Sequence, residues 1–231
     1  MNRHAKIFVD TINTAAKQSS RVKLFDDFLK ISAAALRRDE KTFAEVDNKE
    51  LHCDLLGMLM GALDFDISEK VLHDHGLGIT YRIPTDSSHK PRYHDELGEI
   101  FHALELNDRG GGQVFTPRHI ADIMGETAIT AELVERQLAE KGYVSIIENC
   151  CGSGALILGS LNALLELGVN PNHYALVHAG DTDSRCVLMT FIQLSLYQIP
   201  AVVSCRDAIT GEIRGDSFTT PILKKRLGES S

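Results

Sequence analysis

Apolar residues recur at helical spacing through the first part of the chain. The segments "KIFVDTINTAAK" and "VKLFDDFLKISAAALRR" place them three and four positions apart, and either Ser19 or Ser20 between the segments is suited to an N-cap. The segments "ELHCDLLGMLMGALDF" and "DELGEIFHALEL" predict two further helices, while "GLGITYRIPTDSSHKPRYHD" has the composition of a linker. We therefore predict a helical N-terminal lobe over residues 1–108.

The pattern changes from about Tyr143 onward. The runs "YVSIIEN", "HYALVHAGD" and "AVVSCRDA" are short, apolar and rich in β-branched residues, which is typical of buried strands. The helical segments "ALILGSLNALLELG" and "SRCVLMTFIQLSLYQ" separate them, and Gly168 closes the first at a C-cap position. This alternation predicts an α/β fold, with a Rossmann-like domain over residues 109–231 and a short parallel sheet.

Three predicted strands leave an open sheet edge, because each outer strand has unpaired backbone groups. Three kinds of cover are open at this point: the helical lobe, a second copy of the chain, or a partner subunit. The sequence does not choose among them.

Composition narrows the class of protein. The chain has 231 residues, enough for one core or for one core and a small lobe, and its formal net charge of −8 argues against a stand-alone nucleic-acid binder. The basic clusters at residues 118–122, 36–41 and 223–228 are interpreted as solvent-exposed surface, with small binding patches as the alternative.

No apolar run is long enough to span a membrane and no secretory signal is visible. Five cysteines without a C-x-x-C spacing favour reduced thiols. We expect a cytoplasmic protein with no membrane partner.

The segment "ENCCGSG" lies where the first predicted strand turns into a helix. Gly152 and Gly154 permit a tight turn and a close approach of backbone to a ligand, and the helix N-terminus presents free N–H groups. Glu148, Asp181 and Asp207 stand at the ends of three successive strands, where ligands bind in such sheets. Carboxylates at all three ends suit a nucleoside that carries a cation, which points to S-adenosylmethionine.

Structural alternatives exist for these residues. Asp181 and Asp183 are also suited to cap the following helix, and Asp207 is also suited to a turn. Cys150 and Cys151 are interpreted as small buried thiols beside the turn, because a metal site would need further ligands at suitable spacing. We therefore expect no metal site.

Several motifs in order resemble those of bacterial adenine-amino DNA methyltransferases, especially the modification subunit of type I restriction–modification systems and its phage and plasmid relatives. "ENCCGSG" resembles their "DPxCGSG" motif, and "GGQVFTPRHIADIM" resembles their upstream "GQ(F/Y)FTP" segment. "GDTDSRCVLMTFIQLSL" and "CRDAITGE" are similar to the second and third motifs of the same families. The resemblance covers about residues 95–212.

The resemblance implies an S-adenosylmethionine site whose methionine part lies against residues 115–117, whose ribose is held by Asp181 and whose adenine amine meets Asp207. Glu148-Asn149 replaces the usual Asp-Pro of the family, which keeps the carboxylate and changes its reach. The complete expected set of cofactor-binding residues is Phe115, Thr116, Pro117, Glu148, Gly152, Ser153, Gly154, Asp181, Asp183 and Asp207.

The family's acceptor motif, Asn/Asp-Pro-Pro followed by an aromatic residue, is missing. The chain contains no Pro-Pro dipeptide, and Phe218 is the one aromatic residue after Glu212. That motif aims the target amine at the methyl group and stacks on a flipped base. No catalytic residue is therefore assigned from the sequence.

The resemblance implies methyl transfer to the exocyclic N-6 amine of adenine in DNA, weak or dependent on a partner. DNA, reached through a partner subunit, is the expected substrate, and a homodimer or a specificity-type subunit is the expected assembly. The alternative is a catalytically inactive methyltransferase-like protein that acts as a regulator or as a mimic of a restriction system. A different acceptor, such as a small molecule or a protein, also remains open.

Overall fold

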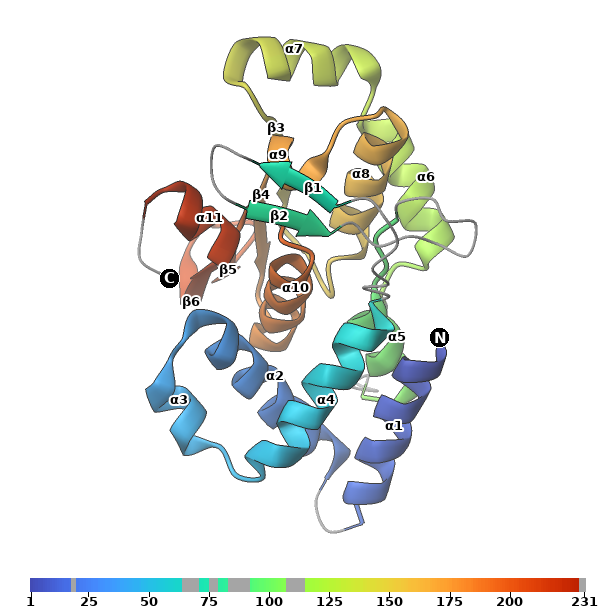
Figure 1. The fold of residues 1–231 in the computed structure, drawn as a ribbon, viewed down its shortest axis with the longest axis vertical. Helices are drawn as coiled ribbons and strands as arrows, with labels where there is room; N and C mark the ends of the chain where they lie inside the picture. Colours follow the sequence, from blue (N-terminus) through green and yellow to red (C-terminus); the bar gives the residue numbers. More distant parts are fainter. Residues whose placement is uncertain (18–19, 64–70, 75–78, 83–91, 107–114, 229–231) are drawn as a thin grey trace.

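The computed structural model describes residues 1–17, 20–63, 71–74, 79–82, 92–106 and 115–228 (Figure 1). Its helices are α1 (Arg3–Ala15), α2 (Arg21–Arg37), α3 (Glu40–Glu45), α4 (Lys49–Ala62), α5 (Glu96–Ala103), α6 (Arg118–Ala128), α7 (Ala131–Lys141), α8 (Ala155–Glu166), α9 (Pro171–Tyr174), α10 (Ser184–Leu196) and α11 (Pro221–Arg226). Its strands are β1 (Val71–Asp74), β2 (Ile79–Arg82), β3 (Val144–Glu148), β4 (Ala175–Asp181), β5 (Ala201–Arg206) and β6 (Ile213–Thr219).

Helices α1, α2, α4 and α5 confirm the helical segments predicted for the N-terminal lobe. Ser20 is the N-cap of α2, where its Oγ accepts a hydrogen bond from the Lys23 N–H at 3.0 Å. The linker prediction is wrong in part, because its residues 79–82 form β2, which pairs antiparallel with β1 in a separate two-stranded sheet. The predicted boundary between residues 108 and 109 lies outside the described residues.

The main sheet has the strand order β3-β4-β5-β6. Strands β3, β4 and β5 are parallel and coincide with the three predicted strands, so the α/β fold class with a Rossmann-like half is confirmed. Strand β6 was not predicted, because most of its residues are polar and exposed. It runs antiparallel beside β5, with Val203 opposite Phe218, and covers one edge that the sequence left open.

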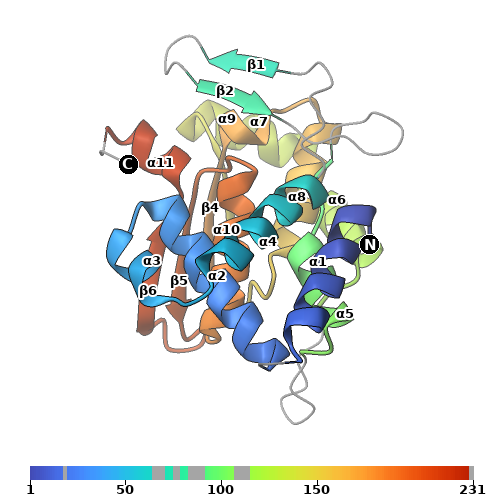
Figure 2. The same cartoon turned by 60° about the horizontal axis from the view of Figure 1, so that its bottom comes forward.

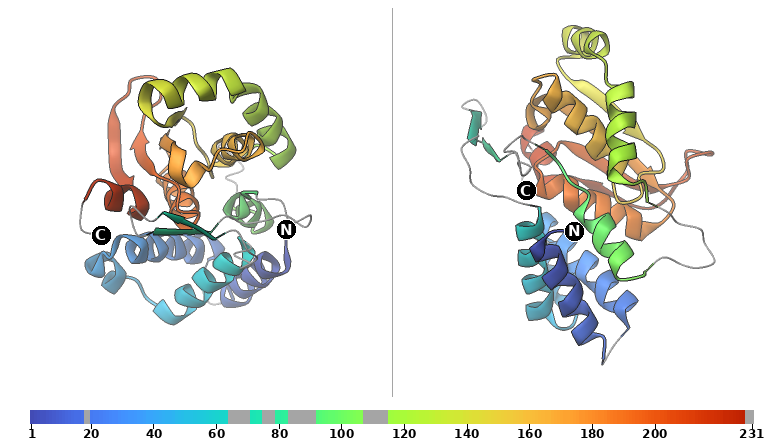
Figure 3. Two further views of the ribbon diagram at one scale, coloured as in Figure 1. Left: turned by 45° about the horizontal axis from the view of Figure 1, so that its top comes forward. Right: turned by 90° about the vertical axis from the view of Figure 1, so that its right-hand side faces the viewer.

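Helix α10 joins the lobe to the sheet. It packs on β4, β5 and β6 on one side and against α2 on the other, as Figure 2 shows. The Nε atom of Arg185 on α10 donates to Asp26 Oδ1 of α2 at 2.7 Å. One continuous hydrophobic cluster runs from the lobe into the sheet half, so the two parts share a core. In Figure 3 the blue and cyan helices of the lobe adjoin the orange and red elements of the sheet half.

The outer edge of β3 carries no further strand within the described part of the chain. Helix α7 covers part of this edge, where Gln137 Oε1 accepts a hydrogen bond from the Ser145 N–H at 2.8 Å. Two residues later Ile147 is 66% exposed. Among the described residues, no helix combines the length and the apolar character that crossing a bilayer requires.

Candidate functional site

The Gly-Ser-Gly turn after β3 has the backbone that only glycine adopts easily. Gly152 has φ +54° and Gly154 has φ +103°, both in the left-handed region. The Cys151 N–H donates to the Gly180 carbonyl of β4 at 2.8 Å, and the Gly154 N–H donates to the Cys151 carbonyl at 2.8 Å. The predicted tight turn is therefore present, and it leads into α8 at Ala155.

Gly152 is held on three sides. Its N–H donates to Asp181 Oδ2 at the end of β4, and its carbonyl accepts from Thr190 Oγ1 of α10, both at 2.9 Å. The ring of Phe115 lies over it, 3.2 Å from the position a Cβ would occupy. A side chain at this position would push against Phe115, so the absence of a Cβ sets how closely the 115–117 segment approaches the turn.

Ser153 points away from solvent into a buried hydrogen-bond network. Its Oγ donates to the carboxylate of Asp95, the N-cap residue of α5. Gln193 Nε2 of α10 donates to Asp95 Oδ1 at 2.9 Å and to the Ser153 carbonyl at 2.7 Å. Burial raises the pKa of Asp95 above its ordinary value, and the hydrogen bonds from Ser153, Gln193 and Gly98 work against that rise.

Sequence reasoning missed Asp95 and Gln193 as residues of this site. A weak signal was present for Asp95, since an Asp before "ELGE" is typical of a helix N-cap. A polar Gln193 inside the apolar run "TFIQLSL" also indicates a buried hydrogen-bond partner. Neither signal identifies the turn as the partner, because the contacts cross 40 to 98 residues of sequence.

Asp181 and Asp183 have different roles at the end of β4. Asp181 accepts from the Gly152 N–H on one oxygen and from the Asp183 N–H at 3.0 Å on the other. Asp183 caps α10, where its Oδ1 accepts from the Arg185 N–H at 2.8 Å. Of the two aspartates considered as helix caps, Asp183 is therefore the one that caps α10. Asp181 links two loops, and each of its oxygens retains acceptor capacity.

Asp207 is engaged in its own turn after β5. Its Oδ1 accepts from the N–H groups of Ile209 at 2.8 Å and Thr210 at 3.0 Å, and its Oδ2 lies 2.6 Å from Arg214 Nη2. These backbone hydrogen bonds lower the pKa of Asp207, and Arg214 adds to the effect. The turn interpretation of Asp207 therefore fits the geometry.

Glu148 and Arg206 place opposite charges near the same strand ends. Glu148 is half-buried, and its Oε1 accepts from the Cys150 N–H at 3.0 Å. Arg206 extends across Gly180 and donates through Nη2 to Asn149 Oδ1, beside Glu148. A Cβ on Gly180 would lie 2.3 Å from Arg206 Nε, so this glycine makes room for the arginine. Sequence reasoning did not place this cation at the site.

Four of the ten predicted site residues line described cavities, in two separate places, and Gly152, Ser153, Gly154, Asp181, Asp183 and Asp207 line none of them. Phe115, Thr116 and Pro117 line a cavity of about 300 Å³ between α5 and the start of α6. His94 lines it too, and burial together with Arg118 lowers the pKa of His94 to about 4. Glu148 lines a smaller groove of about 160 Å³ beside α6 and α8.

Helices α6 and α8 cross at very short range. A Cβ on Gly159 of α8 would lie 2.2 Å from the Ala121 carbonyl oxygen of α6, and a Cβ on Gly125 of α6 would lie 2.3 Å from the Gly159 backbone. These helices begin next to the 115–117 segment and the Gly-Ser-Gly turn. The crossing therefore fixes the two walls of the candidate site relative to one another.

The adjacent cysteines differ. Cys151 is buried, and burial raises the pKa of its thiol to about 12. Cys150 is exposed, so the prediction of two buried thiols is right for Cys151 and wrong for Cys150. The side chain of Cys150 lies on the outer side of the turn that Cys151 anchors in the core. Among the described residues no group of three or more His, Cys, Asp or Glu side chains is arranged to hold a metal ion.

Comparison with known proteins finds no matching family model and no curated protein of similar sequence. Similar solved structures include the following two. One is a Listeria monocytogenes protein provisionally assigned as a class I S-adenosylmethionine-dependent methyltransferase, with 15% identity and a TM-score of 0.48 over 94% of this chain and 57% of that one. The other is the methyltransferase subunit of a type I restriction–modification system from Streptococcus thermophilus, with 12% identity and a TM-score of 0.33 over 90% of this chain and 58% of that one. This chain thus spans less than two thirds of either protein, and at these values the likeness carries no argument about function.

Proposed function

We propose that this chain binds S-adenosylmethionine at the carboxyl ends of β3 and β4, as a protein of the DNA adenine methyltransferase type. The observation that supports this most is the Gly152–Gly154 turn, fixed between Asp181 and the ring of Phe115. A glycine turn at a helix N-terminus, with a carboxylate at the next strand end, is suited to a nucleoside ligand.

The residues at these two strand ends fit the cofactor. Asp181 retains lone pairs for the ribose hydroxyls, and Glu148 is a half-buried carboxylate that suits the ammonium group. The 115–117 segment supplies an apolar wall for the methionine part. S-adenosylmethionine supplies an electrophilic methyl group when it is bound, and the residues named here bind and orient it.

The other expected residues mainly hold the structure around the site in place. Ser153 and Asp183 are engaged in the network under the turn and in the cap of α10. Asp207 holds the shape of the loop after β5, which is the loop proposed to border the adenine. We propose that Asp207 acts on the cofactor through this loop, while Asp181 carries most of the binding energy.

The chain shows no counterpart of the family motif that positions the acceptor of the methyl group. Phe218, the one aromatic residue of the tail, is 6% exposed and packs on Phe191 with ring centroids 5.2 Å apart. It is therefore unsuited to stack on a flipped base. Because the sequence also lacks the Pro-Pro motif, we propose that the chain transfers methyl groups to DNA poorly by itself and that a partner completes the acceptor site.

The basic clusters do not supply a strong DNA-binding face. Arg37 pairs with Asp39 at 2.7 Å, and in the 118–122 cluster Arg118 Nε lies 3.8 Å from Asp122 Oδ2, which also pairs with Arg92. Arg226 of the third cluster donates to the His173 carbonyl at 2.9 Å. With a net charge of −8, approach to phosphates is unfavourable without a partner.

The second candidate function is a methyltransferase-like protein that keeps the cofactor pocket without catalysis. The buried position of Phe218 and the missing Pro-Pro motif favour it. Such a protein would act as a regulator or as a mimic of a restriction–modification subunit. The two candidates differ in methyl transfer and agree in cofactor binding.

Titration calorimetry with S-adenosylmethionine tests the shared part of both candidates. We expect saturable binding heat, and its absence in the folded chain would contradict the proposed site. Transfer of a tritiated methyl group to unmethylated DNA then separates the candidates. We expect little transfer by the chain alone, and transfer that appears on addition of a specificity-type subunit supports the enzyme over the regulator.

A further inference from the structure

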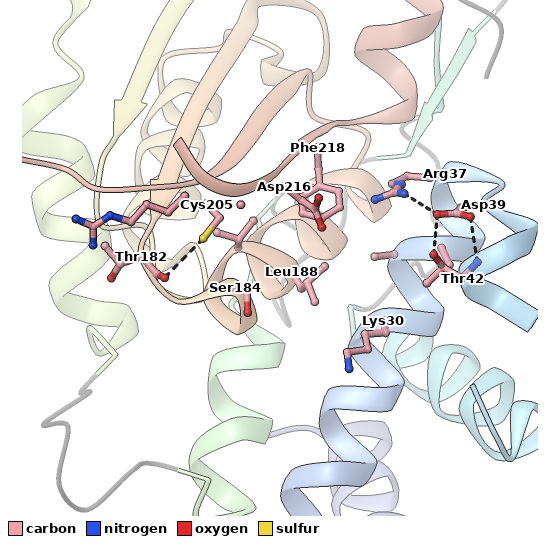
Figure 4. Close-up of a pocket in the computed structure, with 15 residues that line it drawn as sticks. Lys30, Arg37, Asp39, Thr42, Thr182, Ser184, Leu188, Cys205, Asp216 and Phe218 are labelled. Atoms are coloured by element: carbon pink, nitrogen blue, oxygen red, sulfur yellow. Dashed lines mark hydrogen bonds and ion pairs between the residues drawn. The ribbon is translucent and has the colours of Figure 1, made fainter. Parts of the chain in front are cut away.

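A separate cavity of about 510 Å³ lies between the helical lobe and the sheet half (Figure 4). Helix α2, the start of α3, the start of α10 and strands β5 and β6 supply its lining. None of the ten expected cofactor residues lines it. Its volume lies within the range of pockets that bind small organic ligands.

The floor of this cavity is apolar. Ala34 of α2, Val187 of α10 and Phe218 of β6 are buried and face the cavity from three elements. Such a floor excludes water from one side of a ligand and favours an apolar or aromatic body over a fully polar one.

Arg37 provides a flat cationic surface at the wall. Its guanidinium carbon lies 4.9 Å from the centroid of the Phe218 ring, and its Nη2 donates to Asp39 Oδ2 at 2.7 Å. Asp39 is fixed in turn by the N–H and Oγ of Thr42 at 3.1 and 2.9 Å. About a third of the Arg37 side chain, 32%, is exposed. A guanidinium that lies over one aromatic ring is suited to contact a second planar ring on its other side.

The charges of the lining favour an anion. Three cations line the cavity, Lys30, Arg37 and Arg214, against the two carboxylates of Asp39 and Asp216. Arg214 lies 2.6 Å from Asp207, which is outside the lining, so the cation available to a ligand is Lys30. Arg37 and Arg214 already pair with carboxylates, whereas Lys30 is exposed and makes no ion pair with any described residue.

We propose that this cavity binds a small planar aromatic anion, with its ring against Arg37 and the apolar floor and its anionic group near Lys30. Nucleoside monophosphates and aryl carboxylates share this chemistry. The site differs from the proposed cofactor site, although Thr182, which follows Asp181, lines it. A ligand bound here would contact the loop that carries Asp181.

Calorimetry with adenosine 5′-monophosphate, adenosine and indole-3-carboxylate tests this proposal on the full chain. We expect saturable binding of at least one of the two anions and much weaker binding of uncharged adenosine. Binding of the nucleotide alone identifies a nucleotide site, and binding of both anions identifies a general aromatic-anion site. Absence of binding by both anions, or equal binding of adenosine, would overturn the proposal.

Charge variants locate the binding. Lys30→Glu changes an exposed residue and should weaken anion binding about tenfold or more, because it replaces an attractive charge by a repulsive one. The matched control Lys6→Glu, on an exposed position of α1 outside the cavity, should leave binding unchanged. Asp216→Asn should leave binding equal or stronger. An Asp181→Ala variant should keep anion binding, so loss of binding there or competition by S-adenosylmethionine would show that the anion occupies the cofactor site and contradict the proposal.

Discussion

The ends of β4 and β5 both carry an aspartate, and the two residues are used differently. Asp181 at β4 reaches across to the turn after β3 and accepts bonds from two different loops. Asp207 at β5 accepts bonds only from its own loop and pairs with Arg214 of the adjoining strand. The loop that a carboxylate at a strand end faces therefore decides whether it takes part in the site. An acidic residue at the correct position of the strand does not guarantee this role.

The largest effect is expected from removing the support under the β3 turn. Gln193→Leu removes the donor to Asp95 and to the Ser153 carbonyl and the acceptor of the Leu97 N–H, and leaves these buried groups without partners. We expect a loss of about 3–5 kcal/mol in the free energy of unfolding, measured by chemical denaturation. Ser195→Ala on the same helix is the control, because the buried Ser195 hydroxyl has no hydrogen-bond partner among the described groups. Equal effects of both changes would show that the network adds nothing to the fixation of the turn.

The second prediction concerns the acid beside Asp95. Burial raises the pKa of Glu96 to about 8, and its Oε2 has no hydrogen-bond partner among the described groups. An acid whose pKa is higher in the folded state costs stability as the pH rises from its unfolded value, near 4.5, through 8. Glu96→Gln should therefore stabilise the fold by about 2–4 kcal/mol at pH 8 and by little at pH 4.

The measurement for Glu96 is the free energy of unfolding of both proteins across this pH range. Glu140→Gln, at an exposed position of α7 away from Glu96, serves as the control, and it should leave the pH profile nearly unchanged. A Glu96→Gln profile parallel to that of the parent protein would contradict the raised pKa.

The third prediction compares Asp181 and Asp207 directly. Asp181→Ala removes the carboxylate proposed for the ribose and should reduce S-adenosylmethionine affinity by about 1.5–3 kcal/mol, roughly ten- to a hundredfold. Asp207→Ala should have a clearly smaller effect, because its carboxylate already serves its own turn. Calorimetry on both folded variants decides between them, and a larger loss at Asp207 would reverse the assignment.

The smallest effects are expected at the paired cysteines. Cys151→Ala leaves a small buried cavity and should cost about 1–2 kcal/mol of stability, whereas Cys150→Ala should be nearly neutral. A thiol reagent at neutral pH should label Cys150 in the native protein and should leave Cys151 unlabelled, since burial raises the pKa of Cys151 to about 12. Cys53 is also exposed, so peptide mapping must identify which cysteine is labelled in the native Cys150→Ala protein.

Local patterns predicted the elements that place the site. The apolar strands, the helices between them and the glycine turn were all visible, because each depends on neighbours within a few residues. Strand β6 was not visible, since five of its seven residues are exposed and carry no buried-strand pattern. The use of Asp207 in a turn could be weighed only as an alternative.

Long-range partners could not be predicted in the same way. Asp95, Gln193 and Arg206 become part of the site through contacts between elements far apart in the sequence. Cys150 and Cys151 show the same limit at short range, since the direction of the backbone through the turn decides which thiol is buried. The sequence therefore predicts where strands end more reliably than what their terminal side chains contact.

The close crossing of α6 and α8 determines how a ligand can enter. Gly125 lies about 10 Å along α6 from its start, and Gly159 about 6 Å along α8 from its start, so the contact anchors both helices near the site. Because the two backbones touch there, the 115–117 segment and the glycine turn cannot separate like a hinged lid without breaking the crossing. A ligand at these strand ends meets walls already set at their final spacing. Binding should therefore involve little ordering of the protein, and the entropy lost on association should come mainly from the ligand itself.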